Sequence, residues 1–393
     1  MHEVASMNIP GKKSVLYLTI LFLLASFTYC GQKDSGLARG GEPSKTNETA
    51  LLFAGKELPK ESDLYPYTQT AFYRSYARQM ASSWDGMQKP NMQKITEWWS
   101  GHRPSKTYTN VLYPFSGPDI MNALTFFPDA ESIIMFGLEP PGVIPDPHSL
   151  DAARITQGLN GLRGSLGDIL HMNFFKTEGM AAEMSSKSFN SIAGIIMYFL
   201  ATNGYPVIDV KKIVIDANGA VAPGTPADEK IKWEHPPKSR VPGVEILFRN
   251  RAGKTARVRY YMLNVIDAAL ASSSPNFVPY LKKEGPYAVI IKSASYLMHN
   301  DEVKFTKIRA AILDSANYIV QDDSGVPLRY FKADKWKLAF HGYYDGPIGL
   351  FANRMQKDFK KAMDEKSTGR LPFSYGYDYK PGQSNLMTAE KIR

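Results

Sequence analysis

The spacing of hydrophobic residues predicts a helical start to the globular part of the chain. Within residues 65–99, Tyr73, Tyr76, Met80 and Trp84 follow one another at intervals of three and four positions. This spacing brings their side chains onto one face of a helix and leaves polar residues on the other faces. We therefore predict a long amphipathic helical segment here.

The pattern that follows is typical of a parallel sheet. Residues 109–115 are rich in β-formers, residues 120–127 are apolar and helix-like, and residues 132–138 are a second buried strand. A strand, a helix and a strand within about 30 residues form the βαβ unit, because parallel strands need a crossover connection. Residues 151–175 and 188–202 then have helical patterns.

The middle of the chain has the spacing of hairpins, and strand–helix alternation resumes after it. Turn signals at 217–219 and 250–253 separate strand-like runs at 207–215, 244–248 and 256–262 in the region 205–263. Later strands are predicted at 287–292, 318–321, 327–331 and 336–344, with helices at 302–315 and 351–366. We expect an α/β fold with a mixed, mainly parallel sheet, helices on both faces and an antiparallel hairpin insertion near 205–263. Residues 51–393 then form a single body.

The N-terminal segment has the pattern of an export signal. Lys12 and Lys13 precede an almost entirely apolar run over residues 15–27, which is shorter than the ~20 residues of a membrane-spanning helix. The run ends at Cys30, the only cysteine of the chain. These residues resemble the signal peptide and lipobox of bacterial lipoproteins, although Phe27 and Tyr29 depart from the usual pattern.

The resemblance implies that residues 1–29 are a signal peptide and that Cys30 carries acyl chains. Polar, Gly- and Ser-rich residues follow, so residues 30–50 are expected to be an acylated flexible tether. The partner is then a membrane, and the location is the cell envelope, with the outer membrane favoured. An uncleaved anchor helix with an incidental cysteine is the alternative.

Cysteine content and charge exclude several functions. With Cys30 acylated, the body holds no thiol for disulfides, zinc–thiolate sites or a cysteine nucleophile. The formal net charge is +9, but lysines and arginines are scattered along the chain rather than gathered in a run. We therefore expect a solvated basic surface and no nucleic-acid partner. The seven histidines lack metal-binding spacing, so no metal site is predicted.

Polar side chains follow several predicted strands at the point where each strand ends. In an open α/β sheet, ligands bind beyond the carboxyl ends of the strands, so these side chains are expected to share one cleft. The candidate residues are Ser116, Asp119, Glu139, Ser293, Asp322, Asp323, His341 and Asp345. Each has a structural alternative: Ser116 as a helix cap, Asp322 and Asp323 as an acidic turn, and His341 as a buried hydrogen-bonded histidine.

Residues 109–140 also resemble the opening of Rossmann-like methyltransferases and dinucleotide binders. In those families, a small-residue turn after the first strand contacts the cofactor, and an acid ending the second strand holds a ribose. Glu139 lies 22 residues after Gly117, near the expected spacing. The Gly-x-Gly-x-x-Gly pattern is absent and Pro118 removes a backbone donor, so we expect a retained fold with no bound cofactor.

Two functions remain open from the sequence. The first is a non-catalytic, lipid-anchored envelope protein that binds a glycan, a lipid or a protein. The second is a secreted α/β hydrolase or transferase whose site lies at the carboxyl ends of the strands. The sequence has no Gly-x-Ser-x-Gly motif that would mark a nucleophilic serine.

Overall fold

The computed structural model describes residues 44–172, 189–231, 238–300, 304–377 and 379–392. Residues 36–393 form one compact unit. The predicted signal peptide and Cys30 lie outside the described residues. The first described helix begins at Lys45, within the segment predicted as tether.

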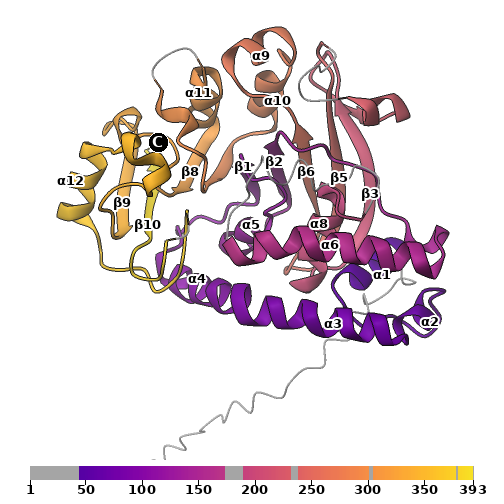
Figure 1. The fold of residues 1–393 in the computed structure, drawn as a ribbon. Helices are drawn as coiled ribbons and strands as arrows, with labels where there is room; N and C mark the ends of the chain where they lie inside the picture. Colours follow the sequence, from indigo (N-terminus) through magenta and orange to yellow (C-terminus); the bar gives the residue numbers. More distant parts are fainter. Residues whose placement is uncertain (1–43, 173–188, 232–237, 301–303, 378, 393) are drawn as a thin grey trace, which may run out of the picture. The chain divides into compact units, whose positions relative to one another are not determined.

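Ten strands form a single sheet (Figure 1). They are β1 (Asn110–Pro114), β2 (Ser132–Gly137), β3 (Val207–Ile215), β4 (Val221–Pro223), β5 (Val241–Arg249), β6 (Thr255–Met262), β7 (Tyr287–Ile291), β8 (Ala316–Gln321), β9 (Trp336–Gly342) and β10 (Asn385–Lys391). Their order across the sheet is β4-β3-β5-β6-β2-β1-β7-β8-β10-β9.

Helices precede β1 and lie in most of the connections between the strands. The α-helices are α1 (Lys45–Phe53), α2 (Tyr65–Thr68), α3 (Ala71–Ser83), α4 (Lys89–His102), α5 (Met121–Phe126), α6 (Ala152–Met172), α8 (Ile192–Thr202), α9 (Asp267–Ser272), α10 (Phe277–Glu284), α11 (Thr306–Ser315) and α12 (Lys357–Lys366). The π-helix is η1 (Trp84–Gln88), and the 3-10 helices are η2 (Pro147–Ser149), η3 (Pro226–Lys230), η4 (Leu297–His299), η5 (Leu328–Tyr330) and η6 (Gly349–Arg354).

The α/β class is confirmed, but the expectation of a mainly parallel sheet is wrong. Pairings β1–β2, β1–β7, β2–β6 and β7–β8 are parallel. Pairings β3–β4, β3–β5, β5–β6, β8–β10 and β9–β10 are antiparallel. The antiparallel pairings lie on both sides of the parallel strands. One cause is β10, which the sequence reading missed and which inserts between β8 and β9.

The parallel strands have the order of a doubly wound fold. Numbered along the chain, β6-β2-β1-β7-β8 read 3-2-1-4-5, the order of the first five strands of a Rossmann fold. β6 thus ends the predicted hairpin region and is also the third strand of the parallel part. The order reverses between β1 and β7, and such a switch point is where ligands bind in these sheets.

Two hydrophobic cores cover the two faces of the sheet, because successive strand residues point to opposite sides. Val111 and Ile133 belong to the core that packs against α1, α3, α4 and α8. Leu112 and Ile134 belong to the core under α9, α10, α11 and α12. Figure 1 shows α3, α4 and α6 along one side and α9, α10 and α11 on the other. Helices therefore cover both faces of the sheet, as predicted.

Most of the predicted N-terminal helical segment is found: α3, η1 and α4 follow one another without a break over residues 71–102, and only the short α2 is separate. Thr70 caps α3 by accepting a hydrogen bond from the backbone N–H of Tyr73. Between α3 and α4, η1 widens the helix over one turn. Pro90 is the second residue of α4, and a proline has no N–H to donate to the preceding turn, which a wider turn accommodates.

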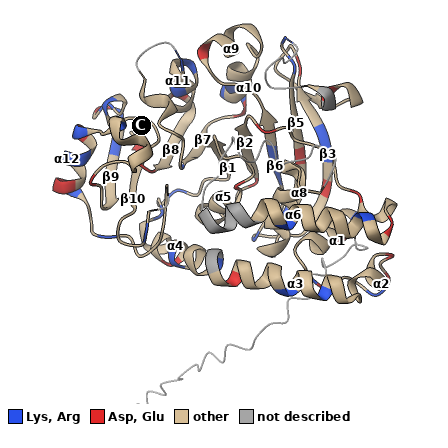
Figure 2. Cartoon of the chain, viewed as in Figure 1, with Lys and Arg blue, Asp and Glu red and all other residues tan. Residues whose placement is uncertain are grey.

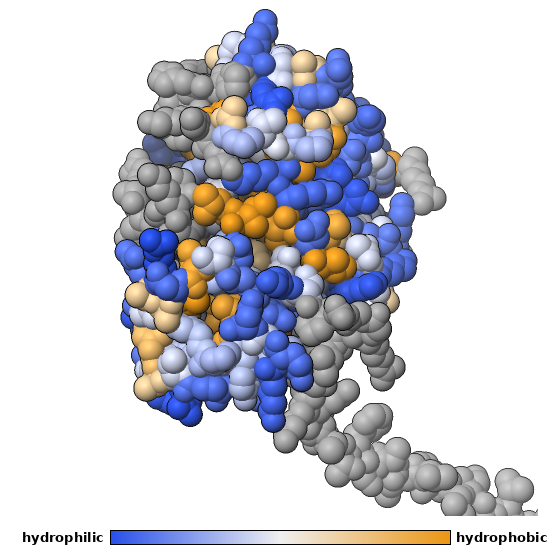
Figure 3. Space-filling model, turned by 90° about the vertical axis from the view of Figure 1, so that its right-hand side faces the viewer, coloured by the Kyte–Doolittle hydropathy of each residue, from blue (hydrophilic) through white to orange (hydrophobic). Residues whose placement is uncertain are grey.

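The sheet edge at β3 is partly covered. β4 pairs only with residues 213–215 of β3, which leaves residues 207–212 beyond its reach. Near α1, Asn47 accepts a hydrogen bond from the N–H of Val207, and Ser44 donates one to the carbonyl of Ile208. Figure 3 faces this side of the molecule and shows an apolar area bordered by hydrophilic residues.

In the part of the chain that the structure describes, no helix combines the length and the apolar character that crossing a membrane requires.

Candidate functional site

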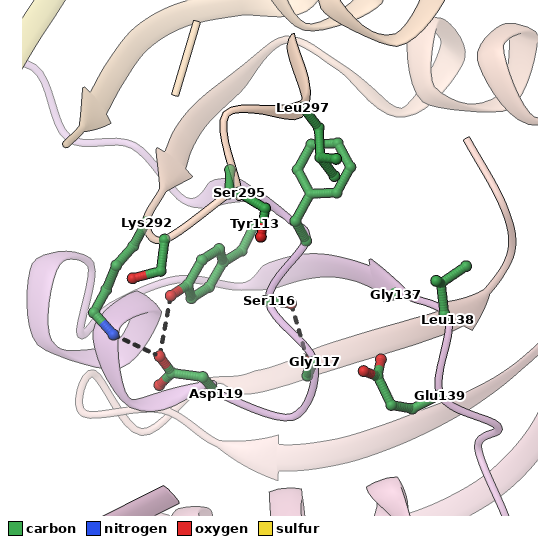
Figure 4. Close-up of a pocket in the computed structure, with 13 residues that line it drawn as sticks. Tyr113, Ser116, Gly117, Asp119, Gly137, Leu138, Glu139, Lys292, Ser295 and Leu297 are labelled. Carbon is green, nitrogen blue, oxygen red and sulfur yellow. Dashed lines mark hydrogen bonds and ion pairs between the residues drawn. The ribbon is translucent and has the colours of Figure 1, made fainter. Parts of the chain in front are cut away.

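A pocket opens at the carboxyl ends of β1, β2 and β7, at the switch point of the sheet (Figure 4). Its cavity volume is about 110 Å³, which is room for a small chemical group and less than the roughly 300–1,000 Å³ of pockets for drug-sized ligands. It is lined by Tyr113, Phe115, Ser116, Gly117, Asp119, Gly137, Leu138, Glu139, Lys292, Ser293, Ala294, Ser295 and Leu297. Four of the eight candidate residues, Ser116, Asp119, Glu139 and Ser293, therefore share one cavity.

Among the described residues, non-glycine residues with positive φ are concentrated at the pocket. Five described non-glycine residues have positive φ, and four of them are Phe115, Ser293, Ser295 and Tyr296. The first three line the pocket and the fourth follows directly. Such conformations cost on the order of 1–3 kcal/mol each and cluster at ligand-binding sites, where the surroundings impose them.

Asp119 forms the polar end of the pocket beneath β1 and β7. Its Oδ2 accepts hydrogen bonds from Tyr113 Oη (3.1 Å) and Asn122 Nδ2 (2.9 Å), and Lys292 Nζ lies 3.4 Å away. The side chains of Asp119 and Lys292 are both buried. Burial and the charge of Asp119 raise the pKa of Tyr113 well above 10, so this phenol remains a donor.

Glu139 forms the opposite polar wall at the end of β2. Tyr260 Oη on β6 donates to its carboxylate Oε2 (3.1 Å) and to its backbone carbonyl (3.0 Å). Burial and the charge of Glu139 raise the pKa of Tyr260 well above 10. Gly137 makes room for this pair, because a Cβ there would lie 2.5 Å from Glu139 Oε2 and 2.8 Å from Tyr260 Oη.

The charges and donors of the pocket disfavour an anionic ligand. Two carboxylates, Asp119 and Glu139, face one ammonium group, Lys292. The backbone N–H of Asp119 bonds to Ser116 O (3.1 Å), and that of Ile120 bonds to Pro118 O (2.8 Å). Both backbone N–H groups are therefore hydrogen-bonded within the turn. A phosphate site at a helix N-terminus needs such N–H groups to bind the anion instead.

Two buried polar atoms of the pocket lack a hydrogen-bond partner among the described residues. They are Asp119 Oδ1 and Ser293 Oγ. Buried polar atoms are nearly always hydrogen-bonded, so an orphaned carboxylate oxygen indicates a place for a water molecule or a ligand donor. In Figure 4 the carboxyl groups of Asp119 and Glu139 lie on opposite sides of Gly117, with Lys292 beside Asp119.

Asp322 supports a pocket wall but does not line the pocket. Its Oδ2 accepts the backbone N–H of Ser293 (2.9 Å), and its Oδ1 accepts that of Ser324 (3.0 Å). Burial raises its pKa, while these hydrogen bonds act in the opposite direction. Asp322 thus holds the strained loop after β7.

Asp323 faces a separate buried network. Its carboxylate is hydrogen-bonded by Tyr296, Tyr379 (3.2 Å) and Asn385 (2.9 Å). Burial and the neighbouring charge of Asp322 raise the pKa of Asp323 to about 7. The prediction that all the candidates share one cleft is therefore wrong for Asp323. Asp322 and Asp323 follow β8 one after the other, but their carboxylates bond to different parts of the chain.

His341 and Asp345 lie apart from the pocket. His341 Nδ1 bonds to Thr368 Oγ1 (2.7 Å), and its ring meets Trp98 edge-on with centroids 5.0 Å apart. Burial and the charge of His102 lower the pKa of His341 to about 4. Asp345 is exposed and pairs with Lys360 at 3.7 Å. Neither residue lines the cavity, so the buried structural histidine is the correct reading of His341.

Ser116 lacks the surroundings of a nucleophile. Its hydroxyl donates to the carbonyl of Gly117 (3.0 Å). None of the described residues that line the pocket is a histidine, so no imidazole is available there as a general base. The geometry is that of a turn serine.

Three residues outside the pocket bring possible metal ligands together. Single ligand atoms of Glu48, Asp63 and His148 lie within 4.8 Å of one another. Both ring nitrogens of His148 already have contacts: Nδ1 with Asp63 Oδ1 (2.5 Å) and Nε2 with Lys45 O (3.2 Å). These contacts therefore connect η2 to α1. A metal ion could bind His148 only by displacing its contact with Asp63 or with Lys45.

Lys292 is at a strand end in the sequence but was not chosen as a candidate, and Tyr113 and Tyr260, which bond to the two carboxylates, were missed. Lys292 is a charged residue directly after the fully buried strand β7, which is a readable signal for a strand-end site. Tyr113 and Tyr260 lie inside apolar strands, so nothing in the pattern separates them from core tyrosines. Only their hydrogen bonds to Asp119 and Glu139 show their role.

No protein-family model matches the chain, and a comparison with curated proteins finds no match.

Proposed function

We propose that this chain is an exported envelope protein, anchored through acyl chains on Cys30, whose body binds a small hydroxyl-bearing ligand without transforming it. The observation that carries the proposal is the switch-point pocket with Asp119 and Glu139 on opposite walls. The outer membrane is the favoured location.

The ligand class follows from the pocket's donors and acceptors. Carboxylate oxygens accept hydrogen bonds from hydroxyl and amino groups, and Glu139 has Oε2 held in place by Tyr260. Lys292 places a single positive charge 3.4 Å from Asp119. A neutral or cationic polyol, such as a sugar, an amino sugar or a nucleoside, matches this set better than a phosphate or a carboxylate.

A transferase is the second candidate. The 3-2-1-4-5 strand order and an acid at the end of β2 favour it, because this acid holds a ribose in nucleotide-binding relatives of the fold. A nucleoside-containing cosubstrate would then occupy the same pocket. The loop after β1 departs from the glycine-rich pattern that such cosubstrates need.

The test is a binding screen on residues 36–393, which contain both hydrophobic cores. Thermal shift and calorimetry would compare monosaccharides, amino sugars, adenosine, S-adenosylmethionine and NAD with inorganic phosphate and citrate. The variants are Glu139→Gln and Asp119→Asn, and exposed Asp345→Asn is the control. We expect a polyol to raise the melting temperature in the parent and the control, and much less in the two pocket variants.

Other outcomes separate the candidates. Binding of S-adenosylmethionine or NAD, followed by turnover with an envelope acceptor, would favour the transferase. Tight binding of phosphate alone, or binding unaffected by both pocket variants, would contradict the proposal. Anchoring is tested separately by radiolabelled palmitate incorporation, which Cys30→Ser should abolish.

A further inference from the structure

Glu139 is a buried carboxylate that has no cationic partner in the part of the chain that the structure describes. Only 4 % of this residue is exposed. Its carboxylate accepts one hydrogen bond, from Tyr260 Oη at 3.1 Å, and no described Lys, Arg or His side chain forms an ion pair with it. Removing an ionised carboxylate from water is costly, so buried carboxylates are normally paired with a positive charge. Glu139 therefore offers a place for a cation.

The second acidic side chain of the pocket differs, because it has a positive charge beside it. Asp119 Oδ2 lies 3.4 Å from Lys292 Nζ, and both side chains are buried. These two opposite charges offset each other, so the lining of the pocket keeps one net negative charge, that of Glu139. Charged residues of both signs are spread over the described helices and strands (Figure 2). The unpaired charge is therefore a property of the pocket and not of an acidic face.

The pocket also offers an acceptor for a second group of the ligand. Asp119 Oδ1 is buried and has no hydrogen-bond partner among the described residues, and the whole residue is 6 % exposed. A carboxylate oxygen can only accept a hydrogen bond, so it needs a donor such as a hydroxyl group. In Figure 4 the carboxyl groups of Asp119 and Glu139 lie on opposite sides of Gly117. One ligand therefore needs a positive charge at Glu139 and a separate donor at Asp119.

The size of the cavity limits how much of a ligand can enter. Its volume is about 110 Å³. A single water molecule needs roughly 10–15 Å³ on such a measure, so the cavity has room for a group of several heavy atoms. An ammonium group and the few carbon and oxygen atoms next to it are of this size. The remainder of a larger ligand would stay outside the mouth.

We propose that the pocket is selective for a small hydroxylated primary amine, whose ammonium group binds Glu139 and whose hydroxyl group donates to Asp119 Oδ1. This inference rests on the proposed function, because it specifies the ligand of the same pocket. Among the polyols considered there, it selects amino sugars over neutral sugars and nucleosides. An ammonium group has three N–H donors, and hydrogen bonds between ionised groups are roughly twice as strong as neutral ones.

The test compares ligands that differ at a single functional group. Calorimetry and thermal shift on residues 36–393 would use glucosamine, glucose and N-acetylglucosamine, together with the smaller pair 2-aminoethanol and ethylene glycol, at about pH 6. Acetylation removes the positive charge and enlarges the group. We expect each free amine to bind about tenfold more tightly than its neutral counterpart, the ratio that a charged hydrogen bond provides over a neutral one. N-acetylglucosamine should bind no better than glucose.

The matched variants are Glu139→Gln and Asp345→Asn, each of which replaces one acid by its amide. Glu139→Gln should bind glucosamine and glucose with affinities within about twofold of each other, because the charge is gone and the shape is kept. Asp345 is exposed and lies outside the pocket, so Asp345→Asn should keep the preference of the parent. Urea unfolding would show whether Glu139→Gln folds. If it does not, the comparison of amine with N-acetyl amine on the parent still decides.

Two results would overturn the inference, and they differ in what else they overturn. Equal binding of amines and neutral polyols by the parent, or a preference that persists in Glu139→Gln, would contradict the selectivity and leave the proposed polyol site standing. Binding of neither class by the parent would contradict the proposed function as well.

Discussion

Tyr377 Oη donates a hydrogen bond to the carbonyl of Ser293 across 2.7 Å, which ties the C-terminal segment to the wall of the pocket. The same oxygen lies 2.6 Å from the backbone N of Ser295 and 2.8 Å from its Oγ. One phenol thus holds two residues with positive φ, Ser293 and Ser295. The strained loop after β7 depends on a side chain that lies more than 80 residues later.

Replacing Tyr377 by phenylalanine should loosen this loop. The Tyr377→Phe variant removes the partner of the Ser293 carbonyl and the Ser295 backbone N–H. These hydrogen bonds are only partly buried, so the loss should be about 0.5–1.5 kcal/mol of unfolding free energy. Ligand binding to the pocket should weaken as well. Urea unfolding and calorimetry would measure both effects, with exposed Tyr343→Phe as the control. Equal stability of Tyr377→Phe and the control would show that the loop holds its shape without the phenol.

Gly137→Ala, at the last residue of β2, should disrupt the pocket that this residue lines. The new methyl group would meet Glu139 Oε2 and Tyr260 Oη at less than 3 Å. We expect a loss of about 1–3 kcal/mol of unfolding free energy, as in overpacked cores, and loss of ligand binding. The control is Gly164→Ala in α6, where open space surrounds the site and alanine should stabilise by about 0.5–1 kcal/mol. A Gly137→Ala protein that binds as the parent does would contradict the role of this wall.

Asp323 should make stability depend on pH near neutrality. Its folded pKa of about 7 lies above the ordinary value of 3.8, so the fold favours the protonated acid. This contribution is complete below about pH 4 and is lost as the pH rises through 7. Relative to Asp323→Asn, whose amide cannot ionise, the parent should therefore lose stability between pH 4 and pH 8. Urea titrations of both proteins across this range would measure the difference, and parallel curves would refute the assignment.

His341 should act in the opposite direction and at lower pH. Its folded pKa of about 4 lies below the ordinary 6.5, because burial penalises the imidazolium. The stability it contributes is complete above about pH 6.5 and is lost as the pH falls through 4. Compared with His341→Asn, the parent should become less stable on acidification over this range. Titration of the His341 ring by NMR would check the cause directly, and a midpoint near 6.5 would rule it out.

The local elements were predictable because hydrophobic spacing encodes them. The pattern over residues 207–215 gave β3 with its observed ends. The strands at β1, β2, β7 and β8 were found within two residues of their ends. The predicted strand at 327–331 was wrong, since residues 328–330 form the 3-10 helix η5.

Part of the site was also predictable. Ser116, Asp119, Glu139 and Ser293 were found because polar residues at the ends of buried parallel strands meet at one edge. His341 and Asp345 were grouped with them because they lie at the end of a predicted strand, and the sequence did not show where that strand lies in the sheet. β9 is an edge strand, separated from β7 by β8 and β10.

The sequence by itself determined the α/β class and most of the elements, because side-chain periodicity of 3.6 or 2 is a local property. It also located the polar strand ends that form the pocket. Only the tertiary structure decided that β10 separates β8 from β9, that Tyr377 holds Ser293, and that Tyr260 bonds to Glu139. These relationships join residues about 40 to 120 positions apart, and such pairings depend on packing of the whole sheet rather than on any local pattern.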